Sequence, residues 1–272
     1  MITLQFHKYH GIGNDFILID NRPSSGGMQP LDGKNVRDLA RRLCERSFSI
    51  GADGLIVVQP SKTAAVKMQI LNPDGTEPEM CGNGIRCLAR FVWETTPLNE
   101  RKDVLSIETK SGVKVVTIVA EEGELKSVEV DMGEPIIEPK DEEIQGRLFK
   151  RVSMGNPHAI FFVENLDSID LEKEGRQIET SHLFPEGTNV EFVKINSRKE
   201  ITVKVWERGA GITLACGTGA SAAAVATINK KLAERTVTVH LPGGDLEIEW
   251  QDDNRVCMRG PAEKVFSGNI EA

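Results

Sequence analysis

The chain has 272 residues, a mass of 29.9 kDa and a formal net charge of −8 at pH 7. Hydrophobic residues make up 39% and charged residues 27%, which is ordinary for a soluble globular protein of one large or two average domains. The negative charge disfavours a nucleic-acid backbone as partner, and no apolar run approaches the ~20 residues of a membrane-spanning helix. The first residues lack a signal-peptide layout, and five cysteines argue against a disulfide framework. We therefore expect a reduced, cytoplasmic protein.

Hydrophobic periodicity predicts an alternation of strands and helices in the first half. Apolar residues at Val36, Leu39, Ala40 and Leu43 have the spacing of an amphipathic helix. In chain order we expect strands at 2–10 and 16–20, a helix at 34–47, strands at 55–59 and 66–72, a turn at 72–76, a helix after Cys81 and a hairpin at 106–119.

The second half repeats this order. It predicts strand, turn and strand over 151–165, a helix at 171–183, a strand at 201–207, an alanine-rich helix after Cys216, a hairpin at 235–250 and a last strand around Cys257.

Three landmarks recur at a nearly constant offset of about half the chain. Asn14 and Asn156 lie 142 positions apart, Gly51 and Gly187 lie 136 apart, and the two Cys-Gly-x-Gly motifs at Cys81 and Cys216 lie 135 apart. One such recurrence is common by chance, but three in order indicate an internal duplication. We expect an α+β (mixed α/β) fold of two similar domains that join near residues 120–127, with the cleft between them as the default site.

Each repeated cysteine is expected at the start of a helix, where free N–H groups and about half a positive charge are available. This position lowers the pKa of a thiol and also suits a carboxylate ligand. Two such units could hold one carboxylate with a sulfur on each side of the adjacent carbon. One thiolate would then remove a proton and the other thiol would deliver one, which is racemisation or epimerisation by two bases without a cofactor.

Other interpretations of the cysteines stay open at this point. A lone cysteine before a helix is usually a small buried hydrophobe. Cys81 and Cys87 have the wrong spacing for a common zinc site, so no metal is expected. A single-nucleophile hydrolase could use His10 or His158, but it leaves the second motif unexplained. The glycines could cradle a phosphate, yet no P-loop Lys-Ser/Thr follows. We interpret Cys44, Cys87 and Cys257 as structural.

The motifs "KYHGIGNDFILID", "MCGNGIRCLARF", "SMGNPH", "ERGAG" and "ACGTGASA" resemble those of diaminopimelate epimerases, and the resemblance runs nearly end to end. It implies two pseudo-symmetric domains, each a curved, mostly antiparallel sheet around a central helix. The expected domains are 1–122 plus 262–272, carrying Cys81, and 123–261, carrying Cys216. The implied activity converts LL-diaminopimelate to the meso form for lysine and peptidoglycan synthesis, with no cofactor. The sequence leaves open whether the protein forms a homodimer.

The resemblance also implies roles for particular residues. Cys81 and Cys216 match the two acid–base thiols, and His158 and Glu207 match residues that support them. The groups expected to hold the substrate are Asn14, Asn72, Gly82, Asn83, Asn156, Asn189, Glu207, Arg208, Gly217 and Thr218. Some family members carry Gln where this chain has Gly54, so one side-chain contact is absent here.

Elementary chemistry supports part of this assignment. Arg208 offers a planar fork for a carboxylate, and Glu207, the preceding strand residue, should point to the opposite face. Adjacent charges are more often a solvated surface pair, and asparagines often form turns. A related proline-type racemase, or a non-catalytic amino-acid-binding protein of the same fold, remains the alternative. Proline has no distal ammonium and carboxylate for Arg208 and the asparagines to bind.

Overall fold

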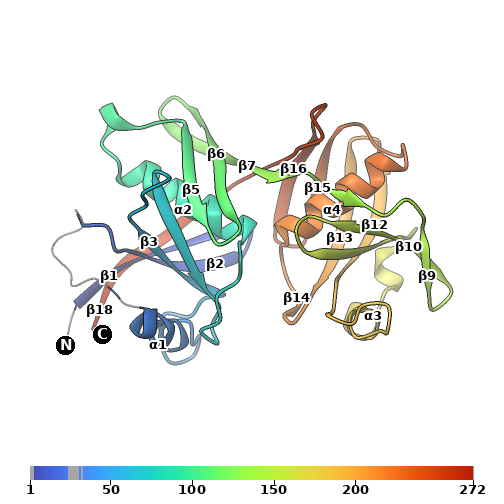
Figure 1. Ribbon diagram of the computed structural model, residues 1–272, viewed down its shortest axis with the longest axis horizontal. Coiled ribbons are helices and arrows are strands. Elements are labelled where there is room, and N and C mark those ends of the chain that lie inside the picture. Colours follow the sequence, from blue (N-terminus) through green and yellow to red (C-terminus); the bar gives the residue numbers. More distant parts are fainter. Residues whose placement is uncertain (1–2, 24–30, 32, 272) are drawn as a thin grey trace. The chain divides into compact units, whose positions relative to one another are not determined.

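A computed structural model describes residues 3–23, 31 and 33–271. The chain divides into two compact units, which we call the N-terminal unit (Met1–Val130 and Pro261–Ala272) and the C-terminal unit (Asp131–Gly260). Figure 1 shows that each unit is a curved sheet with one helix against its concave side and a second helix on its outer face. The fold is the expected mixed α/β type.

Among its described residues, the N-terminal unit contains three helical segments. They are α1 (Gly33–Leu43), α2 (Gly82–Thr95) and the short 3₁₀ helix η1 (Leu98–Glu100). Its strands are β1 (Thr3–Gly11), β2 (Asn14–Asp20), β3 (Gly54–Gln59), β4 (Val66–Leu71), β5 (Val104–Thr109), β6 (Gly112–Glu121), most of β7 (Glu124–Gly133) and β18 (Glu263–Glu271). The hydrogen-bonded order of these strands is β18-β1-β2-β3-β4-β5-β6-β7. Of these described pairs, β2–β3 and β4–β5 are parallel and the others are antiparallel.

The C-terminal unit contains η2 (Leu166–Ser168), α3 (Leu171–Glu179) and α4 (Gly217–Asn229). Its strands are β8 (Ile136–Ile137), β9 (Glu142–Ile144), β10 (Arg147–Ser153), β11 (Pro157–Phe162), β12 (Asn189–Ser197), β13 (Glu200–Glu207), β14 (Gly211–Ile212), β15 (Thr236–Leu241), β16 (Gly244–Trp250) and β17 (Val256–Gly260). The main order is β10-β11-β12-β13-β15-β16-β17, again with two parallel pairs, β11–β12 and β13–β15.

The two units therefore repeat one topology, and their backbones repeat in detail. Gly13 and Gly155 precede the matching asparagines and have φ angles of 86° and 94°. Gly51 and Gly187 have φ angles of 75° and 74°. Left-handed backbone at equivalent turns favours glycine, which explains why these landmarks persisted in the sequence of both halves.

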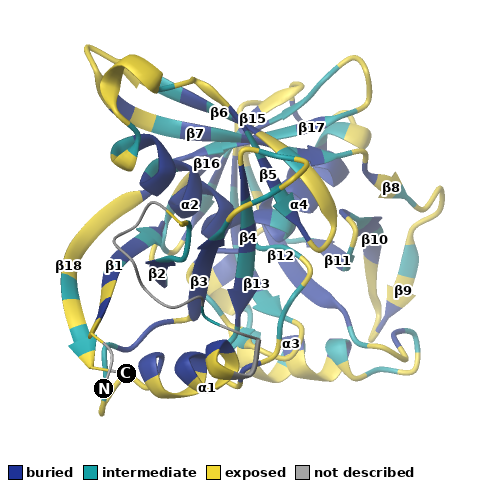
Figure 2. Cartoon of the chain, turned by 60° about the vertical axis from the view of Figure 1, so that its left-hand side comes forward, coloured by how far each residue is buried: buried dark blue, intermediate teal, exposed yellow. Residues whose placement is uncertain are grey.

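The helices of each unit bury different amounts of their surface. The outer helix α1 is amphipathic and packs Val36, Ala40 and Leu43 on the sheet. In contrast, α2 and α4 are buried nearly all round, as Figure 2 shows in dark blue. A helix enclosed by a curved sheet needs small or apolar residues on every side, which explains the alanine-rich sequence of α4.

Two predicted helices end earlier than their apolar pattern suggested. The helix predicted to residue 47 ends at Leu43, because the chain turns and Gly51 N–H donates to the Leu43 carbonyl at 2.9 Å. The helix predicted to residue 183 ends at Glu179, where a tight turn joins Ser181 N–H to the Ile178 carbonyl at 3.1 Å. The long strands β7 and β18 and the short strands β8, β9 and β14 were not predicted.

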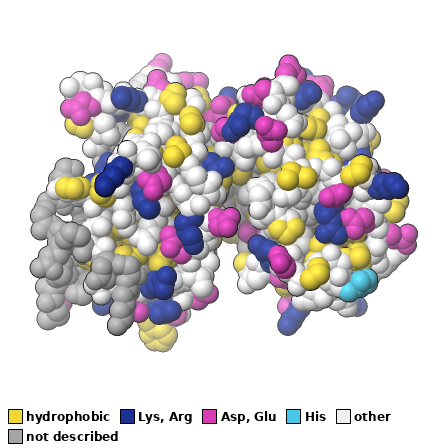
Figure 3. Space-filling view, in the orientation of Figure 1, with side chains coloured by type: hydrophobic (Ala, Val, Ile, Leu, Met, Phe, Trp, Pro, Cys, Tyr) yellow, Lys and Arg dark blue, Asp and Glu magenta, His cyan; other side chains and the backbone are white. Residues whose placement is uncertain are grey.

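Lys and Arg side chains mix with Asp and Glu side chains on the face of each unit drawn in Figure 3. Among the described residues, the helices are too short or too polar to cross a membrane. The same part of the chain contains no cluster of three or more His, Cys, Asp or Glu side chains placed to hold a metal ion.

Candidate active site

Cys81 and Cys216 are the N-caps of α2 and α4, as the repeated motif predicted. Their backbones are extended, with φ/ψ of −138°/118° and −126°/111°. Each sulfur accepts a hydrogen bond from the backbone N–H three residues later, Gly84 at 3.5 Å and Gly219 at 3.4 Å. Both thiols thus lie where the free N–H groups and the dipole of a helix favour negative charge.

Two predicted asparagines surround Cys81 in the N-terminal unit. Asn14, at the start of β2, places Oδ1 3.8 Å from the Cys81 sulfur. The same oxygen accepts a hydrogen bond from Asn83 Nδ2 at 3.2 Å. Asn14 Nδ2 donates to Asp53 at 2.8 Å, which fixes the orientation of the amide because a carboxylate only accepts. Cys81, Gly82, Asn83 and Asn14 are therefore brought together.

Asn72 occupies a different setting in the same unit. It follows β4 and donates from Nδ2 to Thr76 Oγ1 at 3.0 Å, while Asn72 N–H bonds to the Thr76 carbonyl at 2.8 Å. These bonds close the predicted turn. They account for Asn72 as a turn residue, so its role in binding stays a prediction.

A continuous hydrogen-bond chain leads to Cys216 in the C-terminal unit. Thr218 Oγ1 lies 3.5 Å from the Cys216 sulfur and 3.3 Å from Asn156 Nδ2. Asn156 Oδ1 lies 3.0 Å from His158 Nε2, and His158 Nδ1 lies 2.7 Å from Glu191 Oε1. His158 is thus linked to the thiol through Asn156 and Thr218 rather than by direct contact.

Glu207 approaches the same thiol from the end of β13. Its Oε1 accepts a hydrogen bond from Thr213 Oγ1 at 2.6 Å, and its carboxyl also bonds with Cys216. Burial raises the pKa of Glu207, and the neighbouring Glu191 adds to that increase. A raised pKa suits a carboxyl that exchanges protons with a neighbouring thiol.

The predicted lowering of the thiol pKa is wrong for Cys216. Burial raises the pKa of Cys216 well above its usual value, and the charges of Glu207 and Glu191 raise it further. The hydrogen bonds from Thr218 and Gly219 act in the opposite direction but are weaker. The helix N-terminus is therefore outweighed by desolvation and two carboxylates.

Asn189 and Arg208 are neighbours across the sheet. Asn189 Nδ2 donates to the Pro157 carbonyl at 2.9 Å, and Asn189 Oδ1 accepts from Arg208 N–H at 3.0 Å. The Arg208 side chain is exposed and donates from Nη1 to the Glu186 carbonyl at 3.3 Å. Asn189 therefore fixes the backbone of Arg208, while Glu207 turns inward to Cys216.

Glu191 is a site residue that the sequence analysis missed. Its side chain is fully buried on β12, and Oε2 has no hydrogen-bond partner. A Cβ on Gly219 would lie 2.6 Å from Glu191 Oε1, so the third residue of α4 must be glycine for the carboxyl to fit. The signal was a single carboxylate inside the apolar run "NVEFV", where a buried charge needs a partner.

The other three cysteines lack this setting. Cys44 lies in the core beside α1, and burial raises its pKa to about 11. Cys87 is fully buried within α2, and burial raises its pKa to about 12. Cys257 lies on β17 and is half-buried. None of the three caps a helix.

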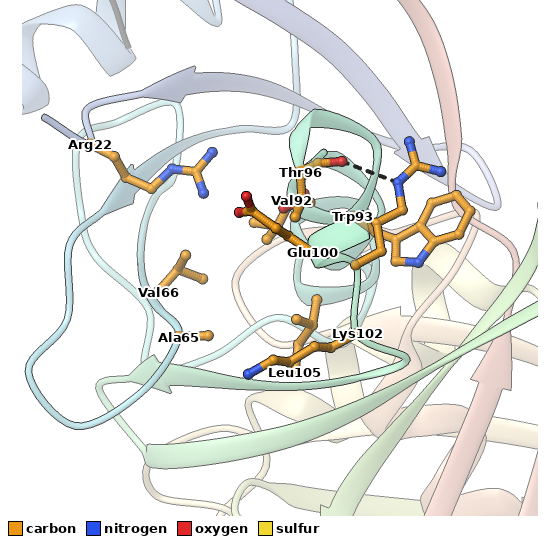
Figure 4. Close-up of a pocket in the computed structure, with 10 residues that line it drawn as sticks. Arg22, Ala65, Val66, Val92, Trp93, Thr96, Glu100, Lys102 and Leu105 are labelled. Atoms are coloured by element: carbon orange, nitrogen blue, oxygen red, sulfur yellow. Dashed lines mark hydrogen bonds between the residues drawn. The ribbon is translucent and has the colours of Figure 1, made fainter. Parts of the chain in front are cut away.

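Figure 4 shows a hollow of about 200 Å³ in the N-terminal unit. It lies at the opposite end of α2 from Cys81, and Trp93, Thr96 and Arg101 are among its lining residues. The Arg101 guanidinium lies 4.1 Å from the centre of the Trp93 ring, and its Nε donates to the Thr96 carbonyl at 3.2 Å. None of the predicted site residues lines this hollow.

Comparison with known proteins identifies the family of the chain. The profile of the family described as diaminopimelate epimerase matches residues 6–138 and 151–265. The chain is similar to the diaminopimelate epimerase of Desulfitobacterium hafniense, with 47% identity over 97% of each chain. It is also similar to that of Carboxydothermus hydrogenoformans, with 48% identity over 97% of this chain and 98% of the relative.

Solved structures at lower identity share the fold. A phenazine biosynthesis protein of the PhzF family from Bacillus anthracis matches with a TM-score of 0.76 and 15% identity over 100% of both chains. A hydroxyproline epimerase from Agrobacterium vitis matches with a TM-score of 0.71 and 15% identity over 98% of this chain and 92% of that one. At this identity the likeness concerns the fold alone. The profile and the relatives with nearly half of their residues identical carry the assignment: the chain belongs to the diaminopimelate epimerase family.

Proposed function

We propose that this protein interconverts LL- and meso-2,6-diaminopimelate by a two-base mechanism that uses Cys81 and Cys216. The observation that carries the proposal is the pair of cysteine N-caps in two units of the same topology, in a chain whose relatives bear the name of this epimerase. Duplicated thiols at helix N-termini meet the need of the reaction for two acid–base groups beside one carboxylate.

The proposed reaction balances one proton removed against one delivered. One sulfur, as thiolate, takes the α-hydrogen as a proton and leaves the electron pair on the carbon. The charge spreads into the α-carboxylate, where backbone N–H groups of Gly82, Asn83, Gly217 and Thr218 are suited to stabilise it. The second sulfur, as thiol, gives its proton to the opposite face of the carbon. The two cysteines thus exchange protonation states in each turnover.

Supporting roles follow from the contacts around each thiol. Glu207 touches Cys216 and has a raised pKa, so it can exchange a proton with that sulfur. His158 acts at a distance by fixing the amide of Asn156, whose Nδ2 faces Thr218. The asparagines, Asn14, Asn72, Asn156 and Asn189, supply neutral donors and acceptors for the distal amino-acid end of the substrate.

Arg208 is the proposed reader of the distal carboxylate. Its guanidinium is exposed and its backbone is fixed by Asn189, so a planar fork is available to a ligand. Neither proline nor lysine has a carboxylate at that end. We place the activity in the cytoplasm, in lysine and peptidoglycan precursor synthesis, as the family resemblance implies.

The decisive experiment is exchange of the α-hydrogen in heavy water. We expect deuterium to enter LL-diaminopimelate in the presence of the protein, with formation of the meso isomer, and no exchange into proline. Exchange into proline but not into diaminopimelate would favour the proline-type alternative. Exchange into neither amino acid, by folded protein with free thiols, would contradict the proposed function.

A further inference from the structure

The residue five positions after each catalytic cysteine differs in charge between the two units. In the N-terminal unit this residue is Arg86, and in the C-terminal unit it is Ser221. Both side chains are fully buried, and both donate to the carbonyl of the first helical glycine. Arg86 Nη1 lies 3.1 Å from the Gly82 oxygen, and Ser221 Oγ lies 2.9 Å from the Gly217 oxygen. The two side chains make the same hydrogen bond, but only the one in the N-terminal unit carries a cation.

Hydrogen bonds fix the Arg86 guanidinium near the N-terminus of α2. Nη2 donates to Asn83 Oδ1 at 2.9 Å, and Nε donates to the Pro261 carbonyl at 3.1 Å. Gly11 leaves the space for it, because a Cβ there would lie 3.0 Å from Nη2. Burial lowers the pKa of Arg86 only to about 10, so the group is a cation at neutral pH, and the charge of Cys81 acts in its favour.

Two carboxyl groups lie near Cys216 in the C-terminal unit. Glu207 and Glu191 both interact electrostatically with this sulfur, and both oppose its ionisation. Burial raises the pKa of Glu191, and His158, whose Nδ1 lies 2.7 Å from Glu191 Oε1, acts against that increase. Each of the two carboxyls is on a strand packed against α4, so the field at Cys216 comes from the sheet as well as from the helix.

Other titratable groups also lie near Cys81 in the described part of the N-terminal unit. Cys87 lies on the same helix, but its raised pKa keeps it neutral. From the loop after α1, Asp53 reaches Asn14, one amide away from the sulfur, and is paired with Arg46 at 2.6 Å. Asp15 on β2 is paired with the same Arg46 at 2.7 Å and with Lys8 at 2.6 Å. These carboxylates are compensated by their own cations.

We propose that Arg86 is a positioning residue that stabilises negative charge on Cys81, so that the resting protein carries its thiolate on Cys81 and a protonated thiol on Cys216. The assignment rests on the proposed function for its catalytic meaning. It gives the two thiols fixed starting roles: Cys81 takes the first proton, and Cys216 delivers the first one.

Alkylation of each cysteine as a function of pH tests the assignment. The native protein is treated with iodoacetamide, and the peptides containing Cys81 and Cys216 are quantified to obtain the pH midpoint of each reaction. The midpoint reports ionisation and is insensitive to the different exposure of the two sulfurs. We expect the midpoint for Cys81 to lie below that for Cys216. In Arg86→Met the Cys81 midpoint should rise by about one pH unit or more, and Arg86→Lys should restore most of the difference.

Arg90→Met is the matched control. Arg90 lies one turn further along α2, donates to the Ala262 carbonyl at 2.5 Å and is paired with Glu94 at 2.7 Å. It therefore shares the contact with the returning chain and is paired with a carboxylate, and its removal should leave the Cys81 midpoint unchanged. An equal rise in Arg90→Met would mean that loss of structure, not of charge, moves the midpoint, and would overturn the proposal.

Other outcomes also decide the matter. A Cys81 midpoint that stays fixed in folded Arg86→Met rejects the role of Arg86. If Arg86→Met does not fold, Arg86→Gln removes the charge while keeping a donor for Asn83, and the same rise is expected. A parent protein in which Cys216 ionises first rejects the assignment without any variant. Because alkylation needs no substrate, these results stand even if no diaminopimelate is turned over.

Discussion

In the N-terminal unit, the parallel strands behind the cysteine carry Phe16 and Ile56; in the C-terminal unit, the equivalent positions carry His158 and Glu191. The equivalence follows from the register, which pairs Phe16 with Gly54 on β3 and His158 with Asn189 on β12, each two residues before Ile56 or Glu191. All four of these side chains are buried. One unit therefore packs its thiol helix on apolar groups, and the other packs it on an ionisable pair.

The difference teaches that the two halves kept the same backbone after duplication, whereas their buried ionisable residues diverged. Turns, strand order and the cysteine N-cap are required by the fold of each half, so they recur. Buried ionisable groups have no such requirement, and a guanidinium came to lie near Cys81 whereas two carboxyl groups came to lie near Cys216. Under the proposed function this is expected, because LL- and meso-diaminopimelate are not mirror images. An epimerase has no need for two equal thiols.

Removing each thiol in turn should have the largest effect. Cys81→Ala and Cys216→Ala should each lower the epimerisation rate by at least about 10²- to 10⁴-fold, because the two-base reaction cannot proceed with one base missing. Turnover is measured with the thermal unfolding midpoint as a check on folding. Cys257→Ala, a change on β17 at a cysteine that caps no helix, should keep near-parental activity. A folded Cys81 or Cys216 variant with normal turnover would remove that residue from the mechanism.

Substitution of Arg208, in the C-terminal unit, should have the next largest effect on activity. Arg208→Ala should lower kcat/KM for diaminopimelate by a factor that corresponds to about 2–5 kcal/mol of transition-state stabilisation, because a substrate carboxylate loses its bidentate partner. Arg208→Lys should recover only part of this, and lysine should be a very poor substrate of the parent.

Arg198→Ala is the control for Arg208, since Arg198 likewise donates to a backbone carbonyl, that of Lys231 at 3.2 Å. Its kcat/KM should equal that of the parent. If Arg208→Ala loses activity on diaminopimelate and lysine in equal proportion, Arg208 does not read the distal carboxylate.

A smaller effect, opposite in sign to that of Arg86, is expected from Glu207 and Glu191, whose carboxyl groups should raise the pH midpoint for alkylation of Cys216. A negative neighbour disfavours the thiolate, so Glu207→Gln should lower the pH midpoint for alkylation of Cys216, and Glu191→Gln should lower it less. Glu200→Gln, at the exposed beginning of β13, is the control and should not move the midpoint. A midpoint that rises in Glu207→Gln would show that its hydrogen bond to the sulfur outweighs its charge.

Ser221→Ala should give the smallest effect and sharpen the contrast with Arg86. Loss of the hydroxyl removes one buried hydrogen bond, which should lower the free energy of unfolding by about 0.5–1.5 kcal/mol. The Cys216 midpoint should not change, since no charge is lost. Thr227→Ala removes the same kind of bond two turns later, at 2.7 Å from the Ala223 carbonyl, and should cost a similar amount. A shift of the Cys216 midpoint in Ser221→Ala alone would contradict this view of the position.

Local patterns in the sequence predicted many of the helices and strands but little of the electrostatics around the two cysteines. The cysteine N-caps and the hairpin β15–β16 follow from helix starts, glycines and alternation over short stretches. The burial of Arg86 does not, because the sequence predicted a helix after Cys81 but not the curved sheet that buries most of its residues. Glu191 and His158, which contact each other, lie 33 residues apart in the sequence and meet only through the parallel pairing of β11 and β12.

The last strand has a consequence for how the chain folds during synthesis. β18 pairs with β1 from Thr3–Glu271 to His10–Glu263, and Arg86 and Arg90 bond to the carbonyls of Pro261 and Ala262. Until these residues leave the ribosome, one edge of β1 is unpaired and the helix that carries Cys81 lacks two of its anchors. Residues 131–260 are synthesised earlier and form their own sheet. The half that is made first must therefore finish folding last, against the usual order of folding from the N-terminus.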